Sequence, residues 1–206
     1  MSLTLYYTPM SSATRVHWAL EELGVPFEKV RVDLAAGEQR KPEFLALNPN
    51  GKIPLLVVDG APIFESLAIL LCLGERFGVE KRLYPKEGTR ERLEALKWMC
   101  WTSVSFHDPL SRFLRNNSDR FPAEERNPKA AESAKKELDG LLAILDQHLA
   151  GKEYVLGSDF SLVDVSMAAF MPFLGRLGID FGPHKNINAW VGRCTSRPAL
   201  GRAMSG

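Results

Sequence analysis

The segment Asn48–Pro54, which reads Asn-Pro-Asn-Gly-Lys-Ile-Pro, constrains the fold of this chain more than any other stretch. Asn-Pro and Asn-Gly are both turn signals. Pro54 stands directly before the apolar run Leu55–Val58. Proline has no backbone N–H, so it is tolerated at the entrance to a strand but not inside a central one, and there it can be cis. Such a bend leaves the backbone N–H and C=O of Ile53 free to pair with an extended ligand.

The residues after this turn predict a β-hairpin followed by a helix. Asp59-Gly60 turns the chain, Ile63-Phe64 returns as a second short strand, and Glu65-Ser66 begins a helix that ends before Gly78. The first N–H groups of a helix are unpaired and carry partial positive charge, so a helix N-terminus accepts a carboxylate. The stretch therefore offers free backbone groups that can pair with a peptide, beside a helix N-terminus that can bind a carboxylate. This combination would suit a small acidic peptide.

A strand–helix–strand unit precedes the turn. Alternation predicts a strand at Leu3–Tyr7, helical spacing predicts a helix from about Ser12 to Gly24, and a second strand lies within Val25–Val32. A right-handed crossover joins two such parallel strands. The order βαβ followed by ββα is that of a thioredoxin-like α/β domain, which we assign to residues 1–83.

Only helical patterns follow the linker at Gly78–Gly88. The long amphipathic run Arg90–Arg115 predicts one helix, which Pro109 should kink. Residues 86–206 are therefore expected to form an all-α domain. Three more helices are predicted in this domain. One begins at the Asn127-Pro128 cap and ends at Gly151, and a second begins at the Ser161–Asp164 capping box and ends at Leu177, with a bend at Pro172. The third spans Asn186–Thr195.

Composition narrows the function. The formal net charge of the 206 residues is +1 and no run of Lys or Arg stands out, which argues against nucleic-acid binding. The three cysteines show neither CxxC nor metal-ligand spacing, so we expect no metal and a reducing compartment. The first residues lack a signal-peptide pattern, and the most apolar stretch, Ile63–Leu73, is too short to span a bilayer. We expect a cytoplasmic protein that does not enter membranes.

The two central motifs resemble those of a known family. The pattern N-P-x-G-x-(V/I)-P, a short hairpin and then E-S-x-A-I, here Glu65-Ser66-Leu67-Ala68-Ile69, is similar to the glutathione-binding half of soluble glutathione S-transferases. The resemblance extends over nearly all of the chain. It implies a homodimeric detoxification enzyme that adds the thiolate of its co-substrate glutathione to small hydrophobic electrophiles, with the helical domain shaping the electrophile site.

The resemblance also leaves alternatives open. Some relatives with this architecture bind or regulate without turnover, and others act as glutathione-dependent peroxidases, isomerases or dehalogenases. The sequence does not name the electrophile.

The loop Thr8–Arg15 joins the first strand to the first helix and carries the candidate catalytic groups. It is similar to the loop of serine-type, phi-like transferases, whose active serine lies two residues after the proline, at Ser11. Tyrosine-type members place their catalytic residue at the position of Tyr7. Cysteine-type members have their thiol where Ser12 stands, so disulfide chemistry is less favoured. Without the resemblance, Ser11 and Ser12 are ordinary helix-capping residues.

The family's glutathione contacts carry over to six positions. Glu65 and Ser66 should hold the γ-glutamyl end, and Ile53 should pair with the backbone of the cysteinyl unit. Three further residues align with, or lie close to, contacts of the glycine carboxylate: Gln39, Arg40 and Lys52. The phi pattern has histidine where Gln39 stands. The resemblance gives Ser161 and Asp164 a role in folding, not in catalysis.

Overall fold

A computed structural model of the chain describes residues 2–119 and 121–205 and divides the chain into two compact units. The first unit comprises Met1–Lys86 and Ser196–Gly206, and the second comprises Glu87–Thr195. We expected the second domain to run to residue 206. Instead, the last residues are grouped with the first unit, because they pack and form ion pairs there.

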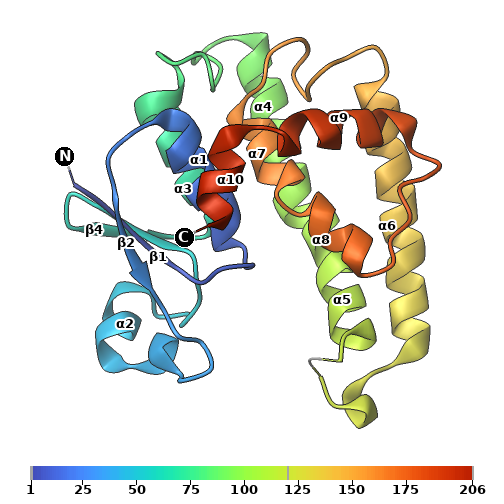
Figure 1. Cartoon of the computed structure of the whole chain (residues 1–206), viewed down its shortest axis with the longest axis horizontal. Helices are drawn as coiled ribbons and strands as arrows, with labels where there is room; N and C mark the ends of the chain where they lie inside the picture. Colours follow the sequence, from blue (N-terminus) through green and yellow to red (C-terminus); the bar gives the residue numbers. More distant parts are fainter. Residues whose placement is uncertain (1, 120, 206) are drawn as a thin grey trace. The chain divides into compact units, whose positions relative to one another are not determined.

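The first unit contains a four-stranded sheet in the order β2-β1-β3-β4 (Figure 1). The edge strand β2 (Glu28–Arg31) runs parallel to β1 (Leu3–Tyr7). The strand β3 (Leu55–Val58) is antiparallel both to β1 and to β4 (Ala61–Phe64). The predicted thioredoxin-like arrangement of a parallel pair and a hairpin is therefore confirmed.

Helices cover both faces of this sheet. Leu3, Leu5 and Tyr7 are buried on one face of the sheet. On this face, Tyr7 contacts His17 of α1 (Ala13–Leu23), and α1 packs against α3 (Ser66–Leu73). Tyr6 points to the opposite face, where it contacts Phe44 of a short helix. Figure 1 shows these layers. The helices α1 and α3 lie on the Tyr7 face, and the short helix on the Tyr6 face is α2 (Pro42–Leu47).

The helix α10 (Pro198–Met204) lies against α1, although nearly the whole sequence separates them. Arg197 makes a two-bond ion pair with Glu22 through Nε and Nη2, both at 2.7 Å. Nε of Arg202 donates to Glu21 at 2.6 Å. Our sequence analysis did not predict α10. A seven-residue helix has little periodicity of its own, and its partners on α1 cannot be inferred from neighbouring residues.

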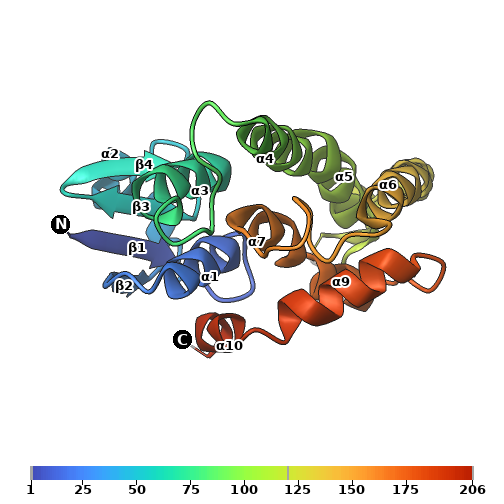
Figure 2. The ribbon, with the colours of Figure 1, turned by 90° about the horizontal axis from the view of Figure 1, so that it is seen from above.

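The second unit is all helical, as predicted. The predicted helix Arg90–Arg115 is interrupted by a π-helical segment, Thr102–Phe106, one turn before Pro109. Proline removes a helical hydrogen bond and its ring displaces the carbonyl four residues earlier, which widens the preceding turn. The helices, also seen from above in Figure 2, are α4 (Arg90–Trp101), α5 (His107–Asn117), α6 (Pro128–Leu149), α7 (Leu162–Ala168), α8 (Met171–Arg176) and α9 (Lys185–Thr195).

The helix predicted to bend at Pro172 is instead two helices, α7 and α8. Pro172 occupies the first turn of α8, where its missing N–H has no helical partner to lose. The predicted Asn127 cap is present, since its side chain accepts from the N–H groups of Lys129 and Ala130. None of the described helices combines the length and apolarity that a membrane span needs.

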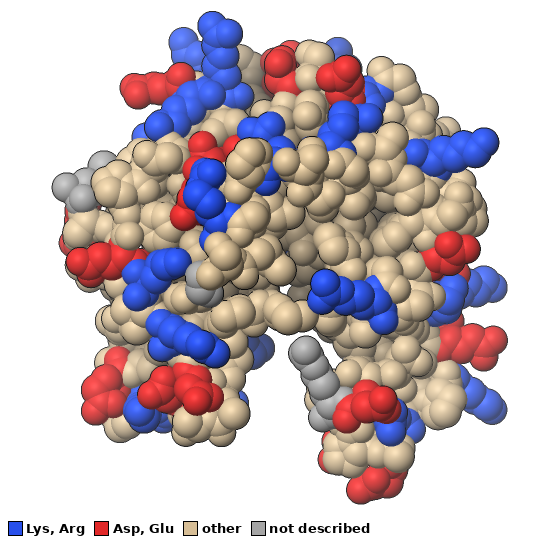
Figure 3. Space-filling view, viewed as in Figure 1, with Lys and Arg blue, Asp and Glu red and all other residues tan. Residues whose placement is uncertain are grey.

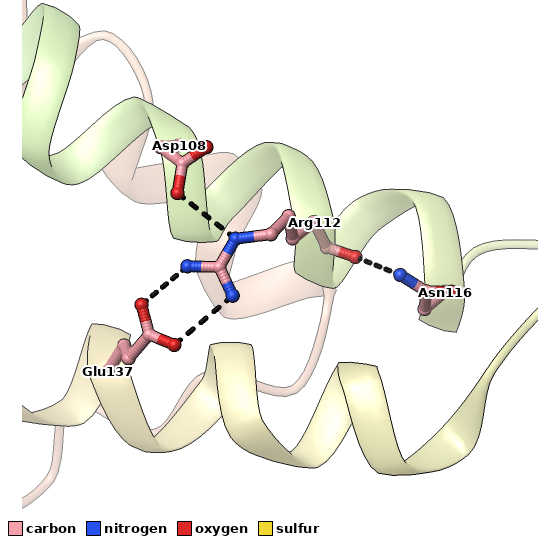
Figure 4. A network of polar contacts seen from close by, with 4 residues as sticks. All are labelled: Asp108, Arg112, Asn116 and Glu137. Atoms are coloured by element: carbon pink, nitrogen blue, oxygen red, sulfur yellow. Dashed lines mark hydrogen bonds and ion pairs between the residues drawn. The ribbon is translucent and has the colours of Figure 1, made fainter.

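A surface network ties α5 to α6 (Figure 4). Arg112 forms a bidentate pair with Glu137, and its Nε donates to Asp108 at 3.0 Å. Arg112 lowers the pKa of Glu137 by hydrogen bonding to its carboxylate. All three side chains are exposed, so the pair adds little stability. Elsewhere on the face drawn in Figure 3, side chains of both charges are interspersed among uncharged ones.

The capping box of α7 is built around a buried, fully bonded carboxylate. Asp164 is fully buried and accepts four hydrogen bonds. One oxygen accepts from the Val155 N–H at 2.9 Å and from Nε1 of Trp190 at 2.8 Å. The other accepts from the N–H and the hydroxyl of Ser161, at 2.9 and 3.0 Å. Burial nevertheless raises the pKa of Asp164. This carboxylate joins a loop, a helix start and α9.

We therefore predict that Asp164→Ala lowers the free energy of unfolding by about 3–5 kcal/mol, because it leaves several buried donors unpaired. Urea unfolding followed by circular dichroism measures the loss. Ser161→Ala is the control and should cost about 0.5–2 kcal/mol, the usual worth of a helix cap. Equal stability of Asp164→Ala and the unchanged protein would contradict the structural role of this carboxylate.

Candidate functional site

The register of the sheet gathers the candidate residues at one end of the first unit. Tyr6 is paired with Leu55, and Leu55 with Phe64. One step beyond these pairs, the chain leaves β1 into the loop before α1, enters β3 through Ile53-Pro54, and leaves β4 toward Ser66. The loop at Ser11, the turn at Ile53 and the N-terminus of α3 therefore lie at the same end of the sheet.

The loop before α1 is held by its own hydroxyl groups. Thr8 donates from Oγ1 to the carbonyl of Val32 at the end of β2. Ser11 donates to the carbonyl of Thr8 at 2.6 Å and accepts from the N–H of Ala13 at 3.1 Å. Met10 adopts a left-handed backbone with φ of 56° and is 56% exposed. The Ser11 hydroxyl thus bonds the first N–H of α1, and its single proton is already donated within the loop.

Ile53 lies where the sequence predicted a backbone edge, and its peptide bond to Pro54 is cis. The expectation that its carbonyl is free needs correction, because the hydroxyl of Ser12 donates to it at 3.2 Å. A carbonyl oxygen has two lone pairs, so one acceptor position remains. The Ile53 N–H makes no hydrogen bond within residues 2–119 and 121–205. Ile53 still offers one donor and one acceptor to an extended peptide.

The buried side chain of Asn48 stabilises this turn by hydrogen bonds, a role that the sequence did not predict. It is 1% exposed. Its Nδ2 donates to the carbonyl of Lys52 at 2.6 Å, and its Oδ1 accepts from the N–H of Asn50 at 3.1 Å. The Asn-Pro dipeptide predicted a turn but not a buried amide. Both ends of the side-chain amide bond backbone groups immediately before Ile53.

Glu65 and Ser66 stand at the start of α3. Glu65 has a φ of 69°, its side chain is exposed, and its carbonyl accepts the first helical hydrogen bond from Ile69. Within the described residues, neither the Glu65 carboxylate nor the Ser66 hydroxyl has a hydrogen-bond or ion-pair partner in the protein. A free carboxylate beside a hydroxyl and helix N–H groups can bind an ammonium group and a carboxylate together.

Gln39 and Arg40 lie against the same turn. A side-chain carbon added to Gly51, whose φ is 57°, would lie 3.0 Å from the Gln39 carbonyl oxygen and 3.2 Å from Nη1 of Arg40. Glycine at this position therefore lets the Arg40 side chain lie over the turn. The buried Oε1 of Gln39 has no partner, and its Nε2 donates to Leu34 at 3.4 Å.

Lys52 is exposed on the turn itself. Within the described part of the chain, neither Lys52 nor Arg40 forms an ion pair with an acidic side chain. Two cationic side chains without carboxylate partners, both beside this turn, could bind the carboxylate of a ligand.

Tyr7 is the last residue of β1, and its ring packs beside α1. It is 8% exposed, and its ring centroid is 5.7 Å from that of His17 on α1. The Lys29 ammonium lies 5.8 Å from the Tyr7 ring centroid. Burial, followed by the charge of Lys29, lowers the pKa of His17, which keeps this imidazole neutral at pH 7. Tyr7 therefore packs in the core beneath α1.

The residues that the structure describes hold no group of three or more His, Cys, Asp or Glu side chains placed to bind a metal ion. The chemistry available at this end of the sheet is hydrogen bonding and charge: hydroxyls at Ser11 and Ser66, the Ile53 backbone, and the charges of Glu65, Arg40 and Lys52.

A thioredoxin-like unit with a cis-proline turn, joined to an all-helical unit, defines the class of protein. The family model "Glutathione S-transferase, N-terminal domain" matches residues 1–74, and "Glutathione S-transferase, C-terminal domain" matches residues 104–198. The chain belongs to the glutathione S-transferase family.

Relatives over the full length agree with this assignment. Glutathione S-transferase GstB of Escherichia coli (strain K12) is 34% identical over 196 residues, covering 94% of this chain and 93% of GstB. Glutathione S-transferase F10 of Arabidopsis thaliana is also 34% identical, covering 97% and 94%. The structure of a sphingomonad glutathione S-transferase complexed with glutathione superposes with a TM-score of 0.85 at 31% identity, covering 98% and 97%.

The buried amide of Asn48 yields a prediction. Asn48→Ala leaves the carbonyl of Lys52 and the N–H of Asn50 without their partner, so we expect the free energy of unfolding to fall by about 1–3 kcal/mol. Chemical denaturation measures it. Asn50→Ala is the matched control, since it removes only the 3.2 Å bond from its own side chain to Asn48, and it should cost less. A larger loss for Asn50→Ala would argue that the turn depends on a different residue.

Proposed function

We propose that this protein is a glutathione S-transferase of the serine type, in which Ser11 stabilises the thiolate of bound glutathione for attack on a small hydrophobic electrophile. The observation that carries the proposal is the grouping of Ser11, the Ile53 backbone and the Glu65-Ser66 helix start at one end of the sheet. In this family, glutathione is the co-substrate.

Each part of glutathione has a chemically matched partner at this end of the sheet. The γ-glutamyl end carries an ammonium and a carboxylate, which suit the free Glu65 carboxylate and the hydroxyl and N–H groups at Ser66. The cysteinyl unit is a peptide, and the Ile53 N–H and the second lone pair of its carbonyl pair with it. The glycine carboxylate lies toward three groups around the Asn48–Pro54 turn: the cations of Arg40 and Lys52, and the amide of Gln39.

The thiol must ionise before it attacks, because the thiolate is the nucleophile. With an ordinary pKa of about 8.5, only about 3% of a thiol is ionised at pH 7. Lowering the pKa by about two units raises that fraction about 25-fold, but the weaker basicity reduces nucleophilicity with a coefficient of about 0.4–0.5. The net gain is about threefold. Holding both substrates in one orientation must supply much of the remaining acceleration.

The Ser11 hydroxyl has one proton, which it donates to the Thr8 carbonyl at 2.6 Å. Donation to a thiolate requires that proton to turn away from Thr8. A neutral hydrogen bond is worth about 1 kcal/mol and one to a charged group about 1.5–3 kcal/mol, so the exchange favours the thiolate. The net stabilisation is about 0.5–2 kcal/mol, which lowers the pKa of the bound thiol by about 0.4–1.5 units.

Ser11→Ala should therefore raise the pKa of enzyme-bound glutathione by about 0.4–1.5 units, toward that of the free thiol. Ultraviolet absorbance of the thiolate, titrated against pH, measures this without the choice of an electrophile. Calorimetry should show a smaller change in glutathione affinity, since the groups at Ile53, Glu65 and Ser66 remain.

Tyr7→Phe is the control and should leave the thiol pKa nearly unchanged, because the Tyr7 ring lies in the core beside His17. A shift with Tyr7→Phe and none with Ser11→Ala would make this a tyrosine-type enzyme. Turnover with a panel of aryl halides, hydroperoxides and α-halo acids separates an S-transferase from a peroxidase, a dehalogenase or a non-catalytic binding protein.

We infer that the active form is a homodimer in the cytoplasm. Leu93 on α4 and Val104 in the π-helical segment that follows it are each 67% exposed. Large apolar side chains exposed to this degree on neighbouring segments are typical of an interface, and two-fold pairing is the commonest soluble assembly. None of the three cysteines, Cys72, Cys100 and Cys194, forms a disulfide bond in the structure, which suits a reducing compartment.

Light scattering at micromolar concentration should give the mass of two chains. Replacing both Leu93 and Val104 by Glu should shift the equilibrium toward one chain, because each added charge would lose its hydration at an interface. Ile144→Glu is the control, since Ile144 is also exposed, at 51%, but lies on α6. A single-chain mass for the unchanged protein would reject the homodimer.

A further inference from the structure

The three hydroxyl groups before and at the start of α1 hold the loop by three separate bonds. Thr8 bonds the carbonyl of Val32, at the end of β2, and Ser11 bonds the carbonyl of Thr8, within the loop. Ser12 bonds the carbonyl of Ile53, 41 residues away, at 3.2 Å. Of these three bonds, that of Ser12 reaches the cis-proline turn. It connects the loop that carries Ser11 to the backbone that precedes β3.

We propose that Ser12 is a positioning residue: its hydroxyl bond to Ile53 fixes the distance between the Ser11 hydroxyl and the Ile53 backbone. This inference rests on the proposed function, in which the same cysteinyl unit of glutathione pairs with Ile53 and directs its sulfur to Ser11. The two contacts lie within a single residue of the ligand, so a small displacement of the loop relative to the turn would break one of them.

The geometry favours positioning over direct contact with sulfur. The Ser12 hydroxyl bonds the carbonyl of Ile53, which is itself part of the site, so turning its one proton toward sulfur would release the turn from the loop. Ser12 is half-buried, and it stands at the start of α1 with a helical backbone, φ of −62° and ψ of −13°. Its side chain is therefore attached to the rigid helix. The bond transmits the position of that helix to Ile53.

The bond also leaves Ile53 competent to bind. The Ser12 hydroxyl occupies one lone pair of the Ile53 carbonyl, and the second lone pair and the N–H stay available for peptide. Without the Ser12 hydroxyl, the carbonyl would take a water or reorient, and the loop would no longer be tied to the turn. The expected consequence is a misplaced thiol in an otherwise intact binding site.

A matched pair of variants isolates the hydroxyl. Ser12→Thr keeps it and Ser12→Val removes it, while both side chains have the same shape. We expect kcat/KM of Ser12→Val to fall about fivefold, the worth of one neutral hydrogen bond, with most of the loss in kcat. The pKa of bound glutathione should rise in Ser12→Val, while Ser12→Thr stays within about twofold of the unchanged enzyme in kcat/KM.

A double-mutant cycle with Ser11 distinguishes the mechanisms. If Ser12 acts by placing Ser11, then adding Ser12→Val to Ser11→Ala should produce no further rise in the pKa of the bound thiol. Additive pKa shifts would make Ser12 a direct donor to sulfur and overturn the proposal. A lower unfolding midpoint in Ser12→Val with an unchanged thiol pKa would also overturn it, since the bond would then be structural only.

Two further measurements keep the test decisive. If Ser12→Thr and Ser12→Val do not fold, Ser12→Ala is compared with the unchanged enzyme instead. The results that support or overturn the proposal are then the same as for Ser12→Val. Calorimetric titration of the unchanged enzyme with glutathione tests the proposed function by itself. Absence of binding there refutes the proposed function, whereas normal binding with a Ser12→Val thiol pKa equal to that of Ser12→Thr refutes only the role of Ser12.

Discussion

The antiparallel pairing of β3 with both of its neighbours is the constraint on which the site depends. The strand is buried between β1 and β4, with Leu55 opposite Tyr6 on one side and opposite Phe64 on the other. Because successive residues of a strand face opposite sides, a slip of one residue would exchange the two faces of the strand. The register thereby fixes which backbone groups stand at the end of the sheet, before any side chain is considered.

Two polar side chains hold this backbone in place by hydrogen bonds. Asn48 uses both ends of its amide to hold the turn, and Ser12 donates its one proton to Ile53. Among the described residues at this end of the sheet, the unpaired groups include the Ile53 N–H, the Ser66 hydroxyl, the buried Oε1 of Gln39 and the exposed Glu65 carboxylate. A buried or half-buried polar group without a partner costs free energy, so a polar ligand gains most at Ile53, Ser66 and Gln39.

The sequence predicted what local chemistry determines. Alternation in Leu3–Tyr7, the Asn127 and Ser161 caps and the Asn-Pro turn each depend on residues a few positions apart, and the structure contains all of them. It could not predict α10, whose position depends on ion pairs from Arg197 and Arg202 to acidic residues on α1. Nor could it predict the partners of hydroxyl groups, because the bond from Ser12 to Ile53 crosses 41 positions.

The sequence alone could not place the surroundings of Tyr7 and Ser11. Alternation predicts that Tyr6 and Tyr7 face opposite sides, but not which side α1 covers. The structure places Tyr7 under α1, against His17, where burial keeps the imidazole neutral and the Lys29 ammonium lies near the phenol ring. Ser11 instead follows the end of β1 in a loop whose backbone already bends through the left-handed Met10. A hydroxyl in such a loop can turn toward a ligand at the cost of one neutral hydrogen bond, and that exchange is what the proposed role of Ser11 requires.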